Sequence, residues 1–266
     1  MTEHDQRPLP SFRTSIGVSD PDTITVLGHD LAAELMGQVG FAELAMWLVT
    51  QRRPTPGQVR VLEAVLVALA DHGFTPTAIA ARLTYLSAPD SVQGALAAGL
   101  LGGGSRFLGV TEDAAMFLAG ALAGQSVPAD DAGFDALALD AIRRARADGR
   151  FVPGLGHHIH KVSDPRTPKL LAIAEAEGLR GPHLRLFEAI GRVHPQVLGR
   201  TLPLNGAGTC GAALADLGLP PELLRGFALL ARTAGLLGHL AEERRAPIGM
   251  EVFQTVERNT EYVDPG

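Results

Sequence analysis

One stretch in the middle of the chain decides the fold, and it reads Val152-Pro153-Gly154-Leu155-Gly156-His157-His158-Ile159-His160-Lys161-Val162-Ser163-Asp164-Pro165-Arg166. Two glycines let the backbone approach a ligand closely just before His157. Lys161 follows four residues on, and Arg166 stands behind an Asp-Pro turn. An imidazole, a flexible cation and a planar guanidinium so close together suit a substrate that carries both a carboxylate and a phosphate-bearing group.

The same stretch allows two simpler interpretations. His157, His158 and His160 could be metal ligands, but neither a cysteine nor an acidic triad accompanies them, so we expect no metal here. The stretch could also be an ordinary polar loop that is exposed to solvent and binds no ligand. The order and spacing of the whole stretch favour a ligand site over both interpretations.

The composition predicts closely packed helices. Of the 266 residues 46% are hydrophobic but only 5% aromatic, and they form one large domain or two unequal lobes with a real core. The net charge of -6 without a basic cluster argues against a nucleic-acid partner. The single cysteine, Cys210, excludes an intrachain disulfide and fits a reducing compartment, so we expect a cytoplasmic protein.

Two segments bear on a membrane location. Residues 1–10 are polar and lack the apolar run of a signal peptide. Residues 223–240 are apolar over nearly the length of a membrane span, but Arg225, Arg232 and His239 interrupt them. A buried helix is the better interpretation, and we expect no membrane partner.

Periodic apolar positions predict helices along the whole chain, without a run of strand-like alternation. Thr55-Pro56 is a typical start for the first helix, and His72-Gly73 a typical end. Residues 1–22 and 247–266 are expected to be arms on either side of a helical domain, residues 23–246. The predicted helices span residues 55–71, 75–86, 91–101, 113–123, 128–147, 166–177, 183–193, 210–217 and 220–245.

The last predicted helix carries a polar stripe. Arg225, Arg232 and His239 recur every seven residues, so on a straight helix each is rotated by only about 20° from the one before. The stripe could simply face water. Arg232 is flanked by leucines on both sides and is the member that we expect to point into a site.

Four motifs resemble, in the same order, those of the citrate synthase superfamily, over roughly residues 31–243. The first stretch resembles the signature of citrate synthases and citryl-CoA lyases. Ala70-Asp71-His72-Gly73 and Gly99-Leu100-Leu101-Gly102-Gly103-Gly104-Ser105-Arg106-Phe107 resemble the lyase module of ATP-citrate lyase, and residues 231–240 resemble the arginine helix of citryl-CoA lyases. Citrate synthases proper have a catalytic histidine where this chain has Gly102, which points to the lyase branch.

The resemblance implies an all-α, two-lobed helical fold, with a small lobe of about residues 107–204 and a large lobe formed by both flanks. It implies that His157 and His72 are catalytic: His157 would hydrogen-bond the oxygen at the carbon being cleaved or attacked, and His72 would contact the oxaloacetate or citrate end. Arg166 and Arg232 would bind substrate carboxylates.

The resemblance also implies coenzyme A (CoA) as a co-substrate, with no covalently bound cofactor. Lys161 would contact the CoA phosphates, and CoA would lie along the backbone of Val152, Pro153, Gly154, Leu155 and Gly156. The other partners would be di- or tricarboxylates. A homodimer is expected as well, because the predicted helices 55–71 and 85–101 are too apolar to face water alone, and Phe253 and Tyr262 in the C-terminal arm would cross to the second subunit.

Ala207 departs from the family pattern. Residues 202–208 align with a family stretch whose aspartate handles the proton at the acetyl methyl carbon, and Ala207 occupies that position. Losing a positioned base typically removes about 10²–10⁴-fold of the rate. Two functions stay open: a CoA-thioester C–C lyase or synthase in which His158, His160 or water moves the proton, and a non-catalytic protein that binds CoA or a carboxylate. The first is favoured.

Overall fold

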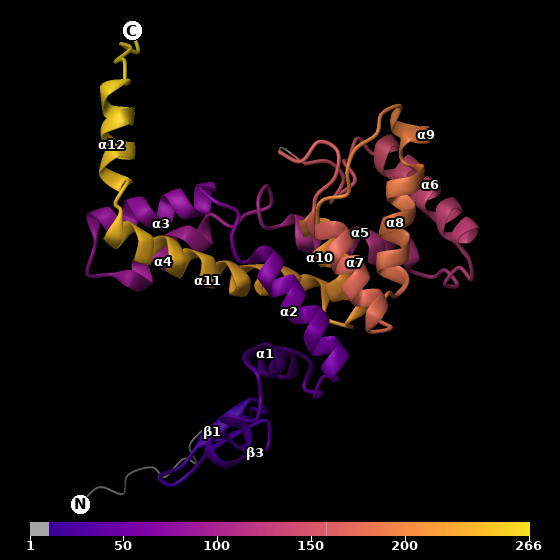
Figure 1. The fold of residues 1–266 in the computed structure, drawn as a ribbon, viewed down its shortest axis with the longest axis horizontal. Coiled ribbons are helices and arrows are strands. Elements are labelled where there is room, and N and C mark those ends of the chain that lie inside the picture. The colour runs from indigo at the N-terminus through magenta and orange to yellow at the C-terminus, as the bar shows by residue number, and fades with distance from the viewer. Residues whose placement is uncertain (1–10, 158) are drawn as a thin grey trace, which may run out of the picture. The chain divides into compact units, whose positions relative to one another are not determined.

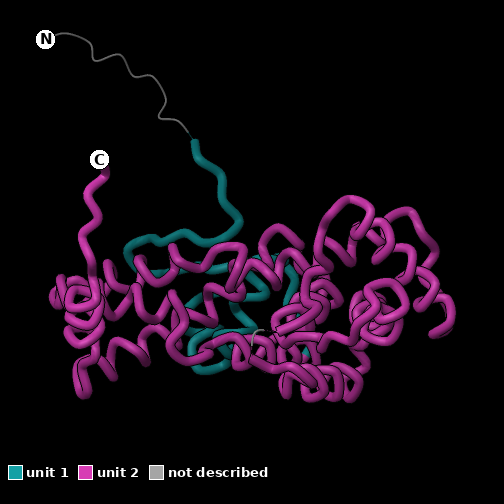
Figure 2. The backbone as a smooth tube through the Cα atoms, turned by 90° about the horizontal axis from the view of Figure 1, so that it is seen from above, with its two compact units in different colours: residues 1–55 teal, residues 56–266 magenta. Residues whose placement is uncertain are grey.

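The computed structural model describes residues 11–157 and 159–266. His158, one of the alternative proton-transfer groups, lies outside the described residues. The chain divides into two compact units, residues 1–55 and residues 56–266 (Figure 2). This boundary differs from those of the lobes predicted around residues 107–204, which stay a prediction.

The first unit contains a small antiparallel sheet with the strand order β1-β2-β3. Its strands are β1 (Gly17–Ser19), β2 (Ile24–Val26) and β3 (His29–Asp30), followed by the π-helix η1 (Leu31–Leu35) and by α1 (Phe41–Thr50). Asp30 begins η1 by accepting hydrogen bonds from the amides of Ala32 and Ala33. The sequence did not predict these strands, because two or three residues are too few for alternation to be recognised.

The second unit is helical, as predicted (Figure 1). Every predicted helix is present, most of them within a few residues of the predicted ends, whereas α9 and α12 were not predicted. The elements are α2 (Pro56–Ala70), α3 (Pro76–Ser87), α4 (Val92–Leu101), α5 (Val110–Leu122), α6 (Asp131–Ala147), α7 (Arg166–Ala176), α8 (Pro182–Val193), α9 (Pro195–Leu198), α10 (Gly206–Asp216), the 3-10 turn η2 (Pro221–Leu223), α11 (Leu224–Arg245) and α12 (Gly249–Arg258).

Two helices organise the core of this unit. α10 is buried over nearly its whole length and packs against α2, α5, α7 and α8. α11 packs against α2, α3, α4 and α5. Cys210 on α10 is fully buried, and burial raises the pKa of its thiol to about 12, so it is a small core residue.

A close approach between α11 and the end of α2 places the polar residues of the two elements side by side. A Cβ atom at Gly235 would collide with the carbonyl group of Ala70, so only glycine fits at this crossing. The contact brings Asp71 and His72, which follow α2, next to Arg232 and His239 of α11. Among the described residues, no helix combines the length and the hydropathy of a membrane span.

Candidate active site

A cavity of about 560 Å³ in the second unit brings the four motifs together. His72, Arg166 and Arg232 line it, and so do His157 with the preceding Gly154, Leu155 and Gly156. Arg106 and Phe107 come from the motif after α4, and Ala207 comes from the first turn of α10. None of the described residues that line this cavity is acidic.

His72 lies in the turn that ends α2. The carboxylate of Asp71 accepts a hydrogen bond of 2.8 Å from the amide of Gly73, and Gly73 has a φ of +74°, which favours glycine. This local turn presents the imidazole of His72 to the cavity. The sequence predicted this helix end, and the catalytic role of His72 stays a prediction.

The loop before His157 is tied to the segment that contains Ala207. The amide of Asn205 donates to the carbonyl of Gly154 at 2.9 Å, and the side-chain amide of Asn205 donates to the carbonyl of Gly156 at 2.8 Å. Gly154 and Gly156 have φ values of +81° and +91°, so both glycines are needed for this path. Asn205 also caps α10 by accepting a hydrogen bond of 2.9 Å from the amide of Gly208.

The hydrogen bonds of His157 define its tautomer. Its Nδ1 atom accepts from the amides of Ile159 and His160, both at 3.0 Å. In the neutral imidazole, Nε2 then carries the hydrogen and is a donor. A donor at Nε2 suits a developing negative charge on a substrate oxygen.

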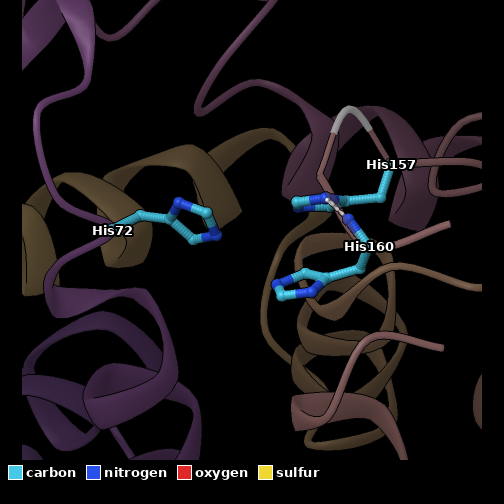
Figure 3. A group of neighbouring side chains, drawn as sticks. All are labelled: His72, His157 and His160. Carbon is cyan, nitrogen blue, oxygen red and sulfur yellow. Dashed lines mark hydrogen bonds between the residues drawn. The ribbon is translucent and has the colours of Figure 1, made fainter.

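Three imidazoles converge here (Figure 3). The ring nitrogens of His72, His157 and His160 lie within 4.8 Å of one another, a spacing that a metal ion could bridge. His157, however, uses Nδ1 to accept backbone hydrogen bonds and carries hydrogen on Nε2, so neither nitrogen offers a metal a lone pair. The arrangement therefore favours hydrogen bonding over metal coordination.

Arg166, the first residue of α7, forms a bidentate pair with Asp164. Its Nε and Nη2 atoms donate to the two carboxylate oxygens at 3.0 and 2.7 Å. Burial alone would raise the pKa of Asp164, but hydrogen bonds from Arg166 and the Gly206 amide hold it well below its usual range. The face of Arg166 that pairs with Asp164 is not open to a second carboxylate while this pair persists, and substrate binding by Arg166 stays a prediction.

Arg232 is the buried cation of the cavity. Its side chain is 5% exposed, and its Nε and Nη1 atoms have no hydrogen-bond partner within the part of the chain that the structure describes. Burial lowers the pKa of the guanidinium, and the charge of Asp71 offsets only part of that effect. Buried donors without partners are costly, so this arginine is suited to an anionic ligand.

A polar network with a buried centre of Arg82, His239 and Glu243 lies behind the His72 turn. His239 Nε2 lies 2.9 Å from a carboxylate oxygen of Asp71, and its Nδ1 accepts from the Nε atom of Arg82 at 3.2 Å. Arg82 donates to Glu243 at 2.8 Å and also contacts Glu242. His239 and Arg232 are buried, so these two members of the predicted stripe do not face water. Arg82 was not predicted, because a single arginine in an apolar helix gives no sign of its distant partners.

A second cavity, of about 570 Å³, adjoins the first and shares Leu155, Gly156 and His157 with it. Val152 lines this second cavity together with Arg146, Arg150 and Arg200. The sequence did not single out these arginines, because they come from separate segments that share no motif.

Two predicted CoA contacts line neither cavity. These are Pro153 and Lys161. The Nζ atom of Lys161 donates to the carbonyl of His157 at 3.2 Å, so Lys161 supports the loop that carries His157.

Comparisons with known proteins agree with the motifs. The family model of the C-terminal domain of citrate synthase matches residues 22–250. The structure of citryl-CoA lyase from Hydrogenobacter thermophilus is similar, with a TM-score of 0.83 and 29% identity over 96% of this chain and 95% of that chain. The ATP citrate lyase from Methanothrix soehngenii, in complex with citrate and coenzyme A, has a TM-score of 0.78 and 23% identity over 98% of this chain and 43% of that chain.

Among proteins compared by sequence, the citrate synthase-like protein oryE of Aspergillus oryzae is 26% identical over 73% of this chain. The chain spans 42% of the length of that protein. The predicted citrate-synthase-like helical fold is confirmed by the family match and by the similarity to citryl-CoA lyase. Because the family model covers most of the sequence, the chain belongs to the citrate synthase family.

Proposed function

We propose that the chain is an enzyme that breaks or forms a C–C bond in a CoA thioester of a tricarboxylate. The reaction is that of a citryl-CoA lyase, which converts citryl-CoA into acetyl-CoA and oxaloacetate, or a related reaction. One observation carries the proposal: the buried, unpaired nitrogens of Arg232 line the same cavity as His157 with its Nε2 donor. The similarity to citryl-CoA lyase over nearly the whole of both chains supports it.

The residues divide the work as follows. Arg232 binds a substrate carboxylate through its unpaired nitrogens. His157 donates from Nε2 to the oxygen on which charge develops, and His72 contacts the carboxylate-bearing part of the substrate. As the C–C bond breaks, its electron pair becomes the enolate of acetyl-CoA, the hydroxyl group loses its proton, and a ketone forms.

The second cavity is suited to CoA. Arg146, Arg150 and Arg200 place three cations around its apolar wall, and phosphate groups are strong acceptors for guanidinium groups. The two cavities meet at Leu155, Gly156 and His157, so the thioester would reach His157 from the side of the arginines. Val152 to Gly156 would lie along the CoA moiety, with Lys161 contacting phosphates from the edge.

Ligand binding tests this proposal directly. A ligand at 100 times its dissociation constant stabilises the folded state by about 2.7 kcal/mol, so CoA, acetyl-CoA, oxaloacetate and citrate should each raise the melting temperature. Arg232→Met should abolish the shifts with citrate and oxaloacetate and leave that with CoA. Arg245→Met, on the exposed end of the same helix, is the matched control. No shift with any of the four ligands would contradict the proposal.

A second function has its own supporting observation. No described residue lining the first cavity is acidic. The sequence also predicts that Ala207 takes the place of the family's proton-transfer aspartate. The chain would then be a non-catalytic protein that binds CoA or a carboxylate. Thermal shifts without any turnover of citryl-CoA would favour this function.

We further propose a cytoplasmic homodimer. The reducing compartment is supported by the single, buried cysteine. The dimer is supported by exposed apolar residues on several helices, including Val67 on α2, Leu101 on α4, and Phe253 and Val256 on α12. α12 lies within the predicted C-terminal arm and would pack against the second subunit. A small lobe of residues 107–204 remains part of the proposal.

A further inference from the structure

We infer that His160 transfers the proton at the acetyl methyl carbon and replaces the carboxylate that the family places at residue 207. This inference rests on the proposed function. The sequence left His158, His160 and water open for the role. Among the described residues, the geometry around His157 and His72 favours His160.

The backbone and the ring of His160 serve different purposes. The backbone amide donates to Nδ1 of His157 at 3.0 Å and orients that imidazole. The ring packs against that of His157 at a centroid distance of 4.6 Å and an interplanar angle of 34°, and it lies 6.1 Å from the ring of His72. Figure 3 shows the rings of His157 and His160 one above the other, both turned toward His72. His160 itself lines neither cavity, but one of its ring nitrogens lies within 4.8 Å of ring nitrogens of His72 and His157, which line the first cavity.

The other groups near the site already have roles. The Nδ1 atom of His157 accepts two backbone hydrogen bonds, and its Nε2 is a donor to substrate oxygen. Asp164 is fully buried and paired with Arg166. Lys161 donates to the carbonyl of His157. Within residues 11–157 and 159–266, neither ring nitrogen of His160 forms a hydrogen bond, so this imidazole can both accept and release a proton.

The step balances without a further reactant. In the cleavage direction, the imidazolium of His160 gives its proton to the methylene carbon of the acetyl-CoA enolate, while the substrate hydroxyl gives its proton to His72. One proton is taken from oxygen and one is delivered to carbon. Water returns the two imidazoles to their starting states. In the reverse direction, neutral His160 removes a methyl proton from acetyl-CoA and leaves the enolate.

Hydrogen–deuterium exchange at the methyl group of acetyl-CoA measures this step alone. The protein is incubated in D₂O with acetyl-CoA and malate, an unreactive stand-in for oxaloacetate, and the loss of the methyl proton signal is followed by NMR. His160→Ala should slow the exchange by about 10²–10⁴-fold, because a positioned base is removed. Its backbone amide, which orients His157, is retained.

Two further variants complete the experiment. Val162→Ala changes an exposed side chain in the same loop, and this variant should exchange at the wild-type rate. Ala207→Asp, added to His160→Ala, should restore exchange by at least tenfold, because it returns a carboxylate to the family position.

The outcomes separate this inference from the proposed function. Wild-type exchange that His160→Ala leaves unchanged would overturn the role of His160 while the proposed function stands. Exchange by Ala207→Asp but not by the wild type would also overturn the role of His160. If the wild type neither exchanges nor shows a thermal shift with CoA and malate, the proposed function fails, and the inference fails with it.

Discussion

At the scale of single residues, a substitution of Arg232 should affect ligand binding and folding stability differently. Its guanidinium is buried with two nitrogens unpaired, so it lowers the stability of the ligand-free protein. Arg232→Met should therefore leave the free energy of unfolding unchanged or raise it by about 1 kcal/mol, while the stabilisation by citrate disappears. Urea denaturation with and without citrate measures both. A loss of several kcal/mol without ligand would show that Arg232 serves the fold instead.

A substitution of Ala207 is expected to increase activity. Ala207 lies in the first turn of α10, where the helix N-terminus favours a carboxylate. Ala207→Asp should raise citryl-CoA cleavage at least tenfold, which corresponds to about 1.4 kcal/mol of transition-state stabilisation. Steady-state release of oxaloacetate measures it. Unchanged cleavage in Ala207→Asp would contradict the placement of residue 207 at the family's proton-transfer position.

At the scale of elements, the crossing of α11 and α2 positions His72. Gly235 touches the carbonyl of Ala70, so Gly235→Ala should separate the two helices, cost about 1–3 kcal/mol of stability and weaken citrate binding. Gly238 lies one turn along α11 with open space at its Cβ position, and Gly238→Ala should stabilise the protein by about 0.5–1 kcal/mol. Equal effects of the two substitutions in thermal denaturation would contradict this account of the crossing.

The network behind His72 predicts a dependence of stability on pH. Burial opposes the charged form of Glu243, but hydrogen bonds from Arg82 and from the Gly249 amide lower its pKa overall. The pKa of Glu243 in the folded state therefore lies below the value of about 4.3 for Glu in the unfolded chain. The ionised carboxylate stabilises the protein above that pH, and this stabilisation is lost as the pH falls toward the folded-state pKa. Glu243→Gln should cost about 3–5 kcal/mol at pH 7 and flatten this dependence. An unchanged pH profile of urea unfolding would contradict it.

At the scale of the whole molecule, the sequence predicted what depends on local periodicity and on motifs. Periodicity predicted the helices of the second unit. The order of the motifs along the chain predicted that four residues would come together, namely His72, His157, Arg166 and Arg232. Helix ends were less accurate. α10 was predicted to begin at Cys210, but it begins at Gly206, because the side chain of Asn205 caps the helix there.

Features that depend on distant partners could not be predicted. The pairing of Arg82 with His239 and Glu243 joins residues about 160 positions apart, and a lone arginine in a helix does not indicate its partner. The same holds for the three arginines of the second cavity, which come from separate segments. The short strands of the first unit lie below the length at which alternation is recognisable.

Assembly is also a property of the whole molecule. The exposed apolar residues on α2, α4 and α12 predict a homodimer at micromolar concentration, measured by light scattering. Phe253→Glu, on the exposed face of α12, should shift the equilibrium toward monomer, and Glu251→Gln on the same helix is its control. A wild-type monomer at that concentration would contradict the prediction.

Incubation of the purified chain with citryl-CoA tests the central claim most directly. The release of acetyl-CoA and oxaloacetate is followed for the wild type, His157→Ala and Arg232→Met. We expect slow cleavage by the wild type, cleavage lowered by at least 10²-fold in His157→Ala, and binding lost in Arg232→Met. A chain that neither binds nor cleaves citryl-CoA, or that cleaves it equally well without His157 and Arg232, would contradict the account.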